Sequence, residues 1–184
     1  MIFRDIEDRD LILRSRKGDV DAYNVLVSRW EKRVYNYLLK QLQNREDALD
    51  LTQDTFLKAY QGLSRLKEPN KFMQWLFRIA RNEAVSLFRR TNRFVDEEVP
   101  EVAEGGVIGV AGTRAFPREW SITVETALSR LTPEQRETVL LKVYEGFKFH
   151  EIAEILACPV STVKSRLYTA FDTLKASLAP VTDD

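Results

Sequence analysis

Long stretches without glycine or proline constrain this chain more than any other feature of its sequence. Residues 19–61 contain neither residue, and residues 72–93 contain neither. Within the first stretch, apolar residues recur three or four positions apart, for example Ala22, Leu26 and Trp30. That spacing places them on one face of an α-helix. The chain is therefore predicted to be all-α rather than a β-sandwich or barrel.

Turn and capping residues set the predicted helix ends. In the N-terminal part, one long helix or two are predicted over about residues 19–42, and further helices over 45–62 and 72–93, with a loop at 64–71. Asn44 can cap the helix at 45–62, and Gly62 ends it. This N-terminal module therefore has three or four helices.

The C-terminal part has the pattern of a helix-turn-helix. Helices are predicted over about residues 122–130, 133–144, 149–156 and 160–178. Thr132 followed by Pro133 and Gln135 forms a capping-box pattern. A short helix, a tight turn at Ala157–Pro159 and a longer helix make up the motif.

An acidic, glycine-rich segment separates the two modules. Four of the seven glycines fall within residues 105–112, beside five acidic residues between Asp96 and Glu104. We interpret residues 95–120 as a flexible linker between a domain at 1–94 and a domain at 121–178, with a tail at 179–184. The fold class is two small helical domains, of which the C-terminal one is a helix-turn-helix.

The residue inventory argues against most catalytic and metal sites. Cys158 and His150 are the only residues of their types, which excludes a disulfide framework, a multi-cysteine zinc site and a serine–histidine triad. We therefore expect that the protein is not an enzyme and does not need a cofactor. No apolar run has the length of a membrane span, and the first residues lack a signal-peptide pattern, so a cytoplasmic location is expected.

The net charge of zero hides a basic segment. Between Arg65 and Arg93 there are eight Lys and Arg residues but only Glu68 and Glu83 as acids. A local cationic excess is typical of a surface that binds polyanions, although a merely solvated helix face would also have it.

Two polar helix faces are candidates for DNA binding. Arg78, Asn82 and Arg89 lie on one stripe, where two guanidinium groups could hold phosphates while the amide contacts a base edge. The preceding loop, with Lys67 and Lys71, could close over an unstacked nucleotide. In the last helix, Ser165 and Tyr168 lie opposite the apolar face, which comprises Val163, Leu167, Ala170, Phe171, Leu174 and Leu178. Periodicity alone leaves open that this is an ordinary amphipathic helix in a bundle.

Several motifs together resemble the extracytoplasmic-function (ECF) class of bacterial sigma factors. They are residues 47–60, 72–82 (FMQWLFRIARN), 128–136 (LSRLTPEQR), 151–156 (EIAEIL) and 158–167 (CPVSTVKSRL). Each motif is weak by itself, but their order around an acidic linker is specific. The resemblance implies a subunit that binds core RNA polymerase, directs it to specific promoters and helps to melt them.

The resemblance also implies roles for individual residues. Contacts with the melted minus-ten element are expected from Lys67, Lys71, Arg78, Asn82 and Arg89. Contacts with the minus-thirty-five duplex are expected from Thr162, Lys164, Ser165, Arg166 and Tyr168. Asp47, Leu51, Gln53, Asp54 and Phe56 would face the polymerase clamp helices. Further expected partners are the polymerase flap and an anti-sigma factor.

Two other functions remain open at this stage. A helix-turn-helix regulator could bind duplex DNA without polymerase core, although no phosphate-binding loop or strand pattern suggests a sensor domain. An all-helical interaction protein without any nucleic-acid role is the second alternative.

Overall fold

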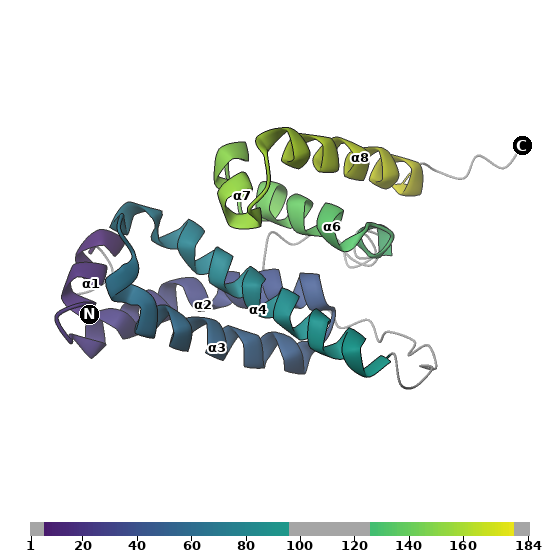
Figure 1. The fold of residues 1–184 in the computed structure, drawn as a ribbon. Helices are drawn as coiled ribbons and strands as arrows, with labels where there is room; N and C mark the ends of the chain where they lie inside the picture. The colour runs from purple at the N-terminus through teal and green to yellow at the C-terminus, as the bar shows by residue number, and fades with distance from the viewer. Residues whose placement is uncertain (1–5, 96–125, 179–184) are drawn as a thin grey trace, which may run out of the picture. The chain divides into compact units, whose positions relative to one another are not determined.

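The computed structural model describes residues 6–95 and 126–178, and these are helical without any strand among them (Figure 1). The helices of the first unit are α1 (Asp8–Ser15), α2 (Val20–Leu42), α3 (Arg45–Gly62) and α4 (Phe72–Val95), with short 3-10 turns η1 (Leu63–Arg65) and η2 (Pro69–Lys71). The second unit is built on α6 (Pro133–Val139), η3 (Leu140–Tyr144), α8 (Val160–Leu178) and the first part of α7 (Phe149–Leu156). The predicted linker and tail lie outside the described residues.

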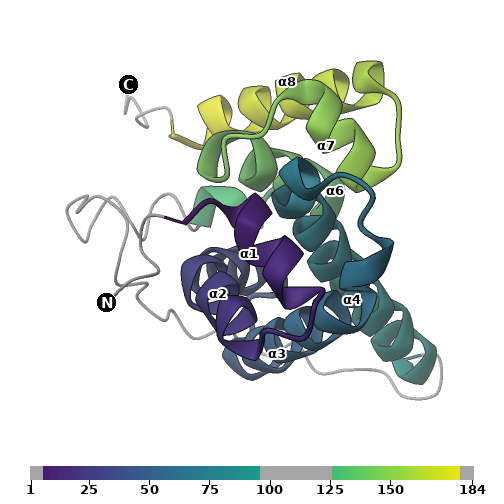
Figure 2. The same ribbon diagram turned by 90° about the vertical axis from the view of Figure 1, so that its left-hand side faces the viewer.

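The first unit is a small helical bundle around one apolar core. Helix α2 packs against α1 and α3, and α4 packs against α2 and α3 (Figures 1 and 2). Leu26, Leu38, Leu76 and Phe77 are fully buried between these helices. No helix in the described part of the chain combines the length and apolar composition that crossing a membrane requires.

The predicted helix ends of the first unit are confirmed. Gln43 adopts a left-handed conformation after α2, with φ of 56°, and so ends that helix. Asn44 then caps α3, because its side-chain oxygen accepts a hydrogen bond from the Asp47 amide at 3.1 Å. Helix α3 ends at Gly62, as predicted.

Helix α1 is the element that the sequence patterns did not indicate. It has only eight residues, but side-chain bonds hold it against α2. The Asp8 carboxylate accepts a bond from the Trp30 indole nitrogen at 2.9 Å and pairs with Arg29. Because short helices are marginal by themselves, we attribute the stability of α1 to these contacts and to the burial of Leu11 and Ile12.

Asp19, the N-cap of α2, makes the stability of the first unit sensitive to pH. The amide of Ala22, at 3.0 Å from the carboxylate, and the guanidinium of Arg14 hold the pKa of Asp19 below its usual value. A carboxyl whose pKa is lowered by folding stabilises the fold above its unfolded pKa, and this contribution is lost as the pH falls. We therefore expect Asp19→Ala to lower the melting temperature by a few degrees at pH 7 but much less at pH 3.

The Asp19→Asn variant provides the matched control in the same thermal melts. Asparagine caps a helix but does not titrate, so the difference between Asp19→Asn and Asp19→Ala should be the same at both pH values. A difference between wild type and Asp19→Ala that stays constant from pH 7 to pH 3 would contradict this account.

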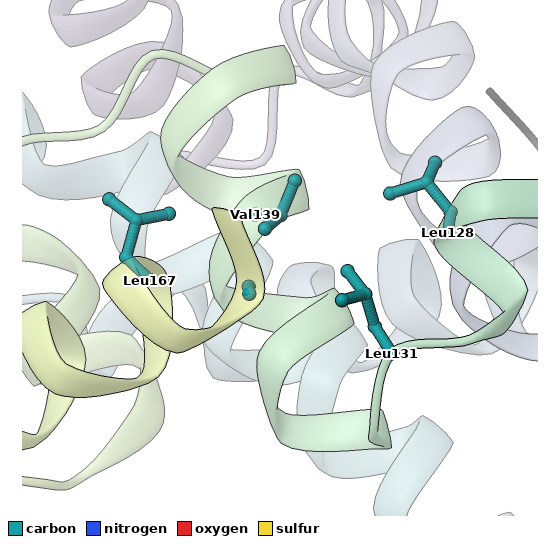
Figure 3. Close-up of a cluster of buried hydrophobic side chains, with 5 residues drawn as sticks. Leu128, Leu131, Val139 and Leu167 are labelled. Atoms are coloured by element: carbon teal, nitrogen blue, oxygen red, sulfur yellow. The ribbon is translucent and has the colours of Figure 1, made fainter. Parts of the chain in front are cut away.

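The second unit has its own core. Leu128, Leu131, Val139, Leu167 and Ala170 are buried together (Figure 3). Phe149 and Leu174 are partly buried and pack against this cluster. The capping box at the start of α6 is confirmed, because Thr132 Oγ1 accepts from the Gln135 amide and Gln135 Oε1 accepts from the Thr132 amide. The predicted helix at 122–130 is observed over residues 126–129, and its start lies outside the described residues.

Two predictions for the second unit need correction. The predicted helix at 133–144 has the expected ends but changes its winding, since η3 is a five-residue π-helix. Phe171, expected in the core of α8, is 42% exposed. The reason is geometric: Val163, Leu167 and Ala170 centre the buried face, and Phe171 lies at its edge.

Candidate nucleic-acid interface

The polar stripe of α4 lies on the surface of the first unit. Arg78, Asn82 and Arg89 are all exposed, and Val85 between them is half-buried. Residues at this spacing share one helix face, so the amide of Asn82 has a guanidinium one turn before it and another two turns after it. Such a face can bind phosphates with its charges and a base edge with its amide.

The opposite face of α4 is anchored by an ion pair. The Glu83 carboxylate, only 10% exposed, receives the Lys58 ammonium of α3 at 2.6 Å. Helical spacing predicts an apolar arc of Phe72, Trp75, Leu76, Ile79 and Leu87 on α4. Phe72 and Leu76 are buried as predicted, whereas Trp75, Ile79 and Leu87 are only partly buried. The rest of the buried face consists of Phe77, Ala80 and Ala84. Asn82 is consequently fixed facing outward, because its neighbour Glu83 is tied to α3.

The loop before α4 is compact. Its two 3-10 turns flank residues 66–68, and the Lys71 ammonium lies 3.4 Å from the Glu68 carboxylate. Lys67 is exposed and Lys71 is partly exposed, so both predicted loop cations are accessible. At the start of the loop, a β-carbon at Gly62 would lie 3.2 Å from the Trp75 ring, so a small residue suits this close approach.

The start of α8 presents a second polar face. Lys164, Ser165 and Tyr168 are exposed, Tyr168 by 62%, while Thr162 and Arg166 are partly exposed. The Lys164 ammonium lies 5.6 Å from the centroid of the Phe149 ring, a distance at which a cation is attracted to an aromatic face. The predicted residues of this face are therefore brought together at the start of one helix, as a recognition helix requires.

The structure divides the five predicted polymerase-contacting residues of α3. Gln53 and Asp54 are exposed and Asp47 is partly exposed, but Leu51 and Phe56 are only 5% and 6% exposed. Leu51 and Phe56 pack in the core beneath this face. Their side chains are therefore not positioned to contact the polymerase directly.

Two apolar residues of the same α3 face were missed. Leu49 and Leu57 are 43% and 56% exposed. They lie four residues before and after Gln53, so helical spacing from Gln53 could have indicated them. The exposed face of α3 is thus apolar at Leu49 and Leu57 and polar at Gln53 and Asp54.

Comparison with known families identifies both units. Residues 26–94 match the Sigma-70 region 2 model, and residues 121–174 match the Sigma-70, region 4 model. The RNA polymerase sigma-H factor of Pseudomonas aeruginosa is 30% identical, over 95% of each chain. The ECF RNA polymerase sigma-E factor of Haemophilus influenzae is also 30% identical, over 96% of this chain and 97% of that protein.

Solved structures give the same assignment. The sigma factor RpoE of Bartonella quintana, solved in complex with the anti-sigma factor NepR, has a TM-score of 0.75 and 26% identity, covering 85% of this chain and 96% of that one. CnrH, solved with the cytosolic domain of CnrY, has a TM-score of 0.69 and 26% identity, covering 93% and 96%. The chain therefore belongs to the sigma-70 family of RNA polymerase sigma factors, in its extracytoplasmic-function class.

Proposed function

We propose that the stripe of α4 and the start of α8 are the two surfaces through which this sigma factor recognises promoters. As an ECF sigma factor, the protein binds core RNA polymerase, directs it to specific promoters and helps to melt them. The observation that carries the proposal is the exposure of Arg78, Asn82 and Arg89 on one face of α4.

The two surfaces suit two physical states of DNA. Helix α8 contacts the major groove of the minus-thirty-five duplex through Thr162, Lys164, Ser165, Arg166 and Tyr168 on this proposal. The separated minus-ten strand is contacted by the α4 stripe together with Lys67 and Lys71 of the loop. Binding of an unstacked base by the protein offsets the few kcal/mol of free energy that unstacking costs. Promoter melting therefore needs no ATP. Tethering raises the local concentration of the second surface once the first has bound.

The exposed face of α3 supports a protein contact. We propose that this face contacts the clamp helices of the polymerase through Asp47, Leu49, Gln53, Asp54 and Leu57. The second unit is proposed to contact the polymerase flap. Apolar residues beside polar ones are typical of protein interfaces. Because a related sigma factor was solved in complex with an anti-sigma factor, we also propose an anti-sigma partner. On this proposal the protein acts in the cytoplasm and only by binding, without an active site of its own.

Run-off transcription with purified core enzyme over a promoter library tests the proposed function. Addition of the protein should start transcripts from a subset of templates that share two elements at a fixed spacing. A regulator that acts without polymerase core would instead retard duplex promoter DNA by itself in a gel-shift assay. An interaction protein without a nucleic-acid role would change neither result.

Lys164 provides a quantitative test of the duplex contact. If its ammonium neutralises one phosphate, Lys164→Gln should weaken promoter binding by holoenzyme and reduce the slope of log K against log salt by about 0.9. The measurement is a salt titration of holoenzyme on a labelled minus-thirty-five duplex.

Lys175→Gln serves as the matched control in the same titration. Lys175 is an exposed lysine in the last turn of α8, remote from the start of that helix. Its substitution should leave the slope at the wild-type value. If Lys164→Gln also has the wild-type slope and affinity, Lys164 does not contact DNA.

A further inference from the structure

Arg16, which follows α1, contacts the backbone where α3 ends and the loop at 64–71 begins. Its Nε–H donates to the Leu63 carbonyl at 3.0 Å, and its Nη2 donates to the Leu66 carbonyl. Arg16 is thereby bonded to residues 47 and 50 positions further along the chain. The side chain is partly buried and belongs to neither predicted DNA-contacting surface.

The two carbonyls that Arg16 binds belong to the turn that ends α3 and opens the loop. Leu63 and Leu66 bracket this turn, and the Leu66 amide donates to the Leu63 carbonyl at 3.3 Å. Carbonyls at the end of a helix lack partners within the helix and carry partial negative charge. A guanidinium binds two such oxygens with fixed geometry, which a point charge such as lysine does less well.

The other end of the loop is held by the start of α4, where the Phe72 side chain is buried. The Lys71 amide donates to the Glu68 carbonyl at 2.9 Å, and α4 begins at the next residue, Phe72. The loop thus joins two fixed points, one of them the Arg16 bonds and the other the start of the helix that presents Asn82. Loss of one fixed point should widen the range of loop conformations without moving α4.

We propose that Arg16 is a positioning residue for minus-ten recognition. By holding the carbonyls of Leu63 and Leu66, it keeps the loop at 64–71 in the geometry that discriminates among bases beside the α4 stripe. Arg16 acts through the loop and makes no DNA contact itself. This inference rests on the proposed function of the loop and of Asn82.

The test compares Arg16→Gln and Arg16→Lys with Lys17→Gln in the full-length protein bound to core enzyme. Lys17 is the adjacent exposed residue, so its substitution removes the same charge without touching the loop. Open-complex formation is measured on a promoter and on versions with single-base changes in the minus-ten element. Arg16→Gln should reduce the preference for the correct base about threefold to tenfold, less than the full contribution of charge-assisted hydrogen bonds because Arg16 acts on the base only through the loop. Arg16→Lys should be intermediate, and Lys17→Gln should equal wild type.

Amide hydrogen exchange of the free protein gives an independent readout. In Arg16→Gln, exchange at residues 64–71 should become faster while the core amides of α2 and α4 keep their protection. A wild-type base preference in Arg16→Gln would overturn the inference. So would an equal loss on every promoter together with weaker core binding, because that pattern indicates a merely structural role. If wild-type protein with core enzyme starts no promoter-specific transcript, the proposed function itself fails.

Discussion

Replacing Asn82 with alanine is expected to slow open-complex formation by holoenzyme about tenfold to a hundredfold, because a well-placed amide contact with a base contributes about 1–3 kcal/mol. Asn82 is exposed on α4 with Arg78 and Arg89 on the same face. The substitution removes the amide between Arg78 and Arg89 and leaves both guanidinium groups. The measurement is the rate at which thymines of the start site become reactive to permanganate.

Asn24→Ala is the matched control for this experiment. Asn24 is an exposed asparagine on α2 of the same unit, so its substitution should leave the rate unchanged. Core binding should be equal in both variants, which separates a DNA contact from a folding defect. A wild-type opening rate for Asn82→Ala would remove Asn82 from the site, and equal slowing in both variants would point to general destabilisation.

Phe77→Ala is expected to lower the unfolding free energy of the first unit by about 3–5 kcal/mol, the usual cost of truncating a buried phenylalanine. The Phe77 side chain is fully buried, and its ring meets the Tyr37 ring edge-on with centroids 5.3 Å apart. Urea unfolding followed by tryptophan fluorescence measures this change. The measurement uses a Trp120→Phe background, because Trp30 and Trp75 lie in the first unit and Trp120, the third tryptophan, does not.

Phe88→Ala on the same helix is the control for the core substitution. The Phe88 side chain is 39% exposed, so its truncation should cost about 1 kcal/mol or less. The two variants change the same residue type within α4. Equal losses of unfolding free energy would show that Phe77 does not contribute to the core as the structure indicates.

Local signals made the helices and the candidate surfaces predictable. Asn44 and Gly62 mark the ends of α3, and the Thr132 capping box marks the start of α6, because each acts on backbone groups within four residues. The exposure of Arg78, Asn82 and Arg89 followed from their shared spacing on α4. Periodicity predicts which residues share a helix face. A face made of charged and polar side chains stays exposed because burying those groups without partners costs free energy.

Contacts between distant residues were beyond prediction. The bonds of Asp8 with Arg29 and Trp30, and of Arg16 with the loop, join positions 21 to 50 apart, where one sequence carries no pairing signal. Leu51 and Phe56 illustrate a second limit. Their motif placed them near a partner, but only the packing of α3 against α2 and α4 shows that they face inward. The partner of Glu83 could not be predicted either, because Lys58 lies on a different helix.

The π-helix at Leu140–Tyr144 constrains how this chain can change its length over evolution. A turn closed five residues back contains one residue more than an ordinary α-helical turn. Deleting one of the five would let the backbone close as an ordinary α-helical turn and leave the elements on either side close to their present orientation. A deletion within α6, where no surplus residue exists, would instead rotate every later side chain by about 100°. The π-helix is therefore the place in this helix where the chain can lose one residue without turning the start of α8 away from its present direction.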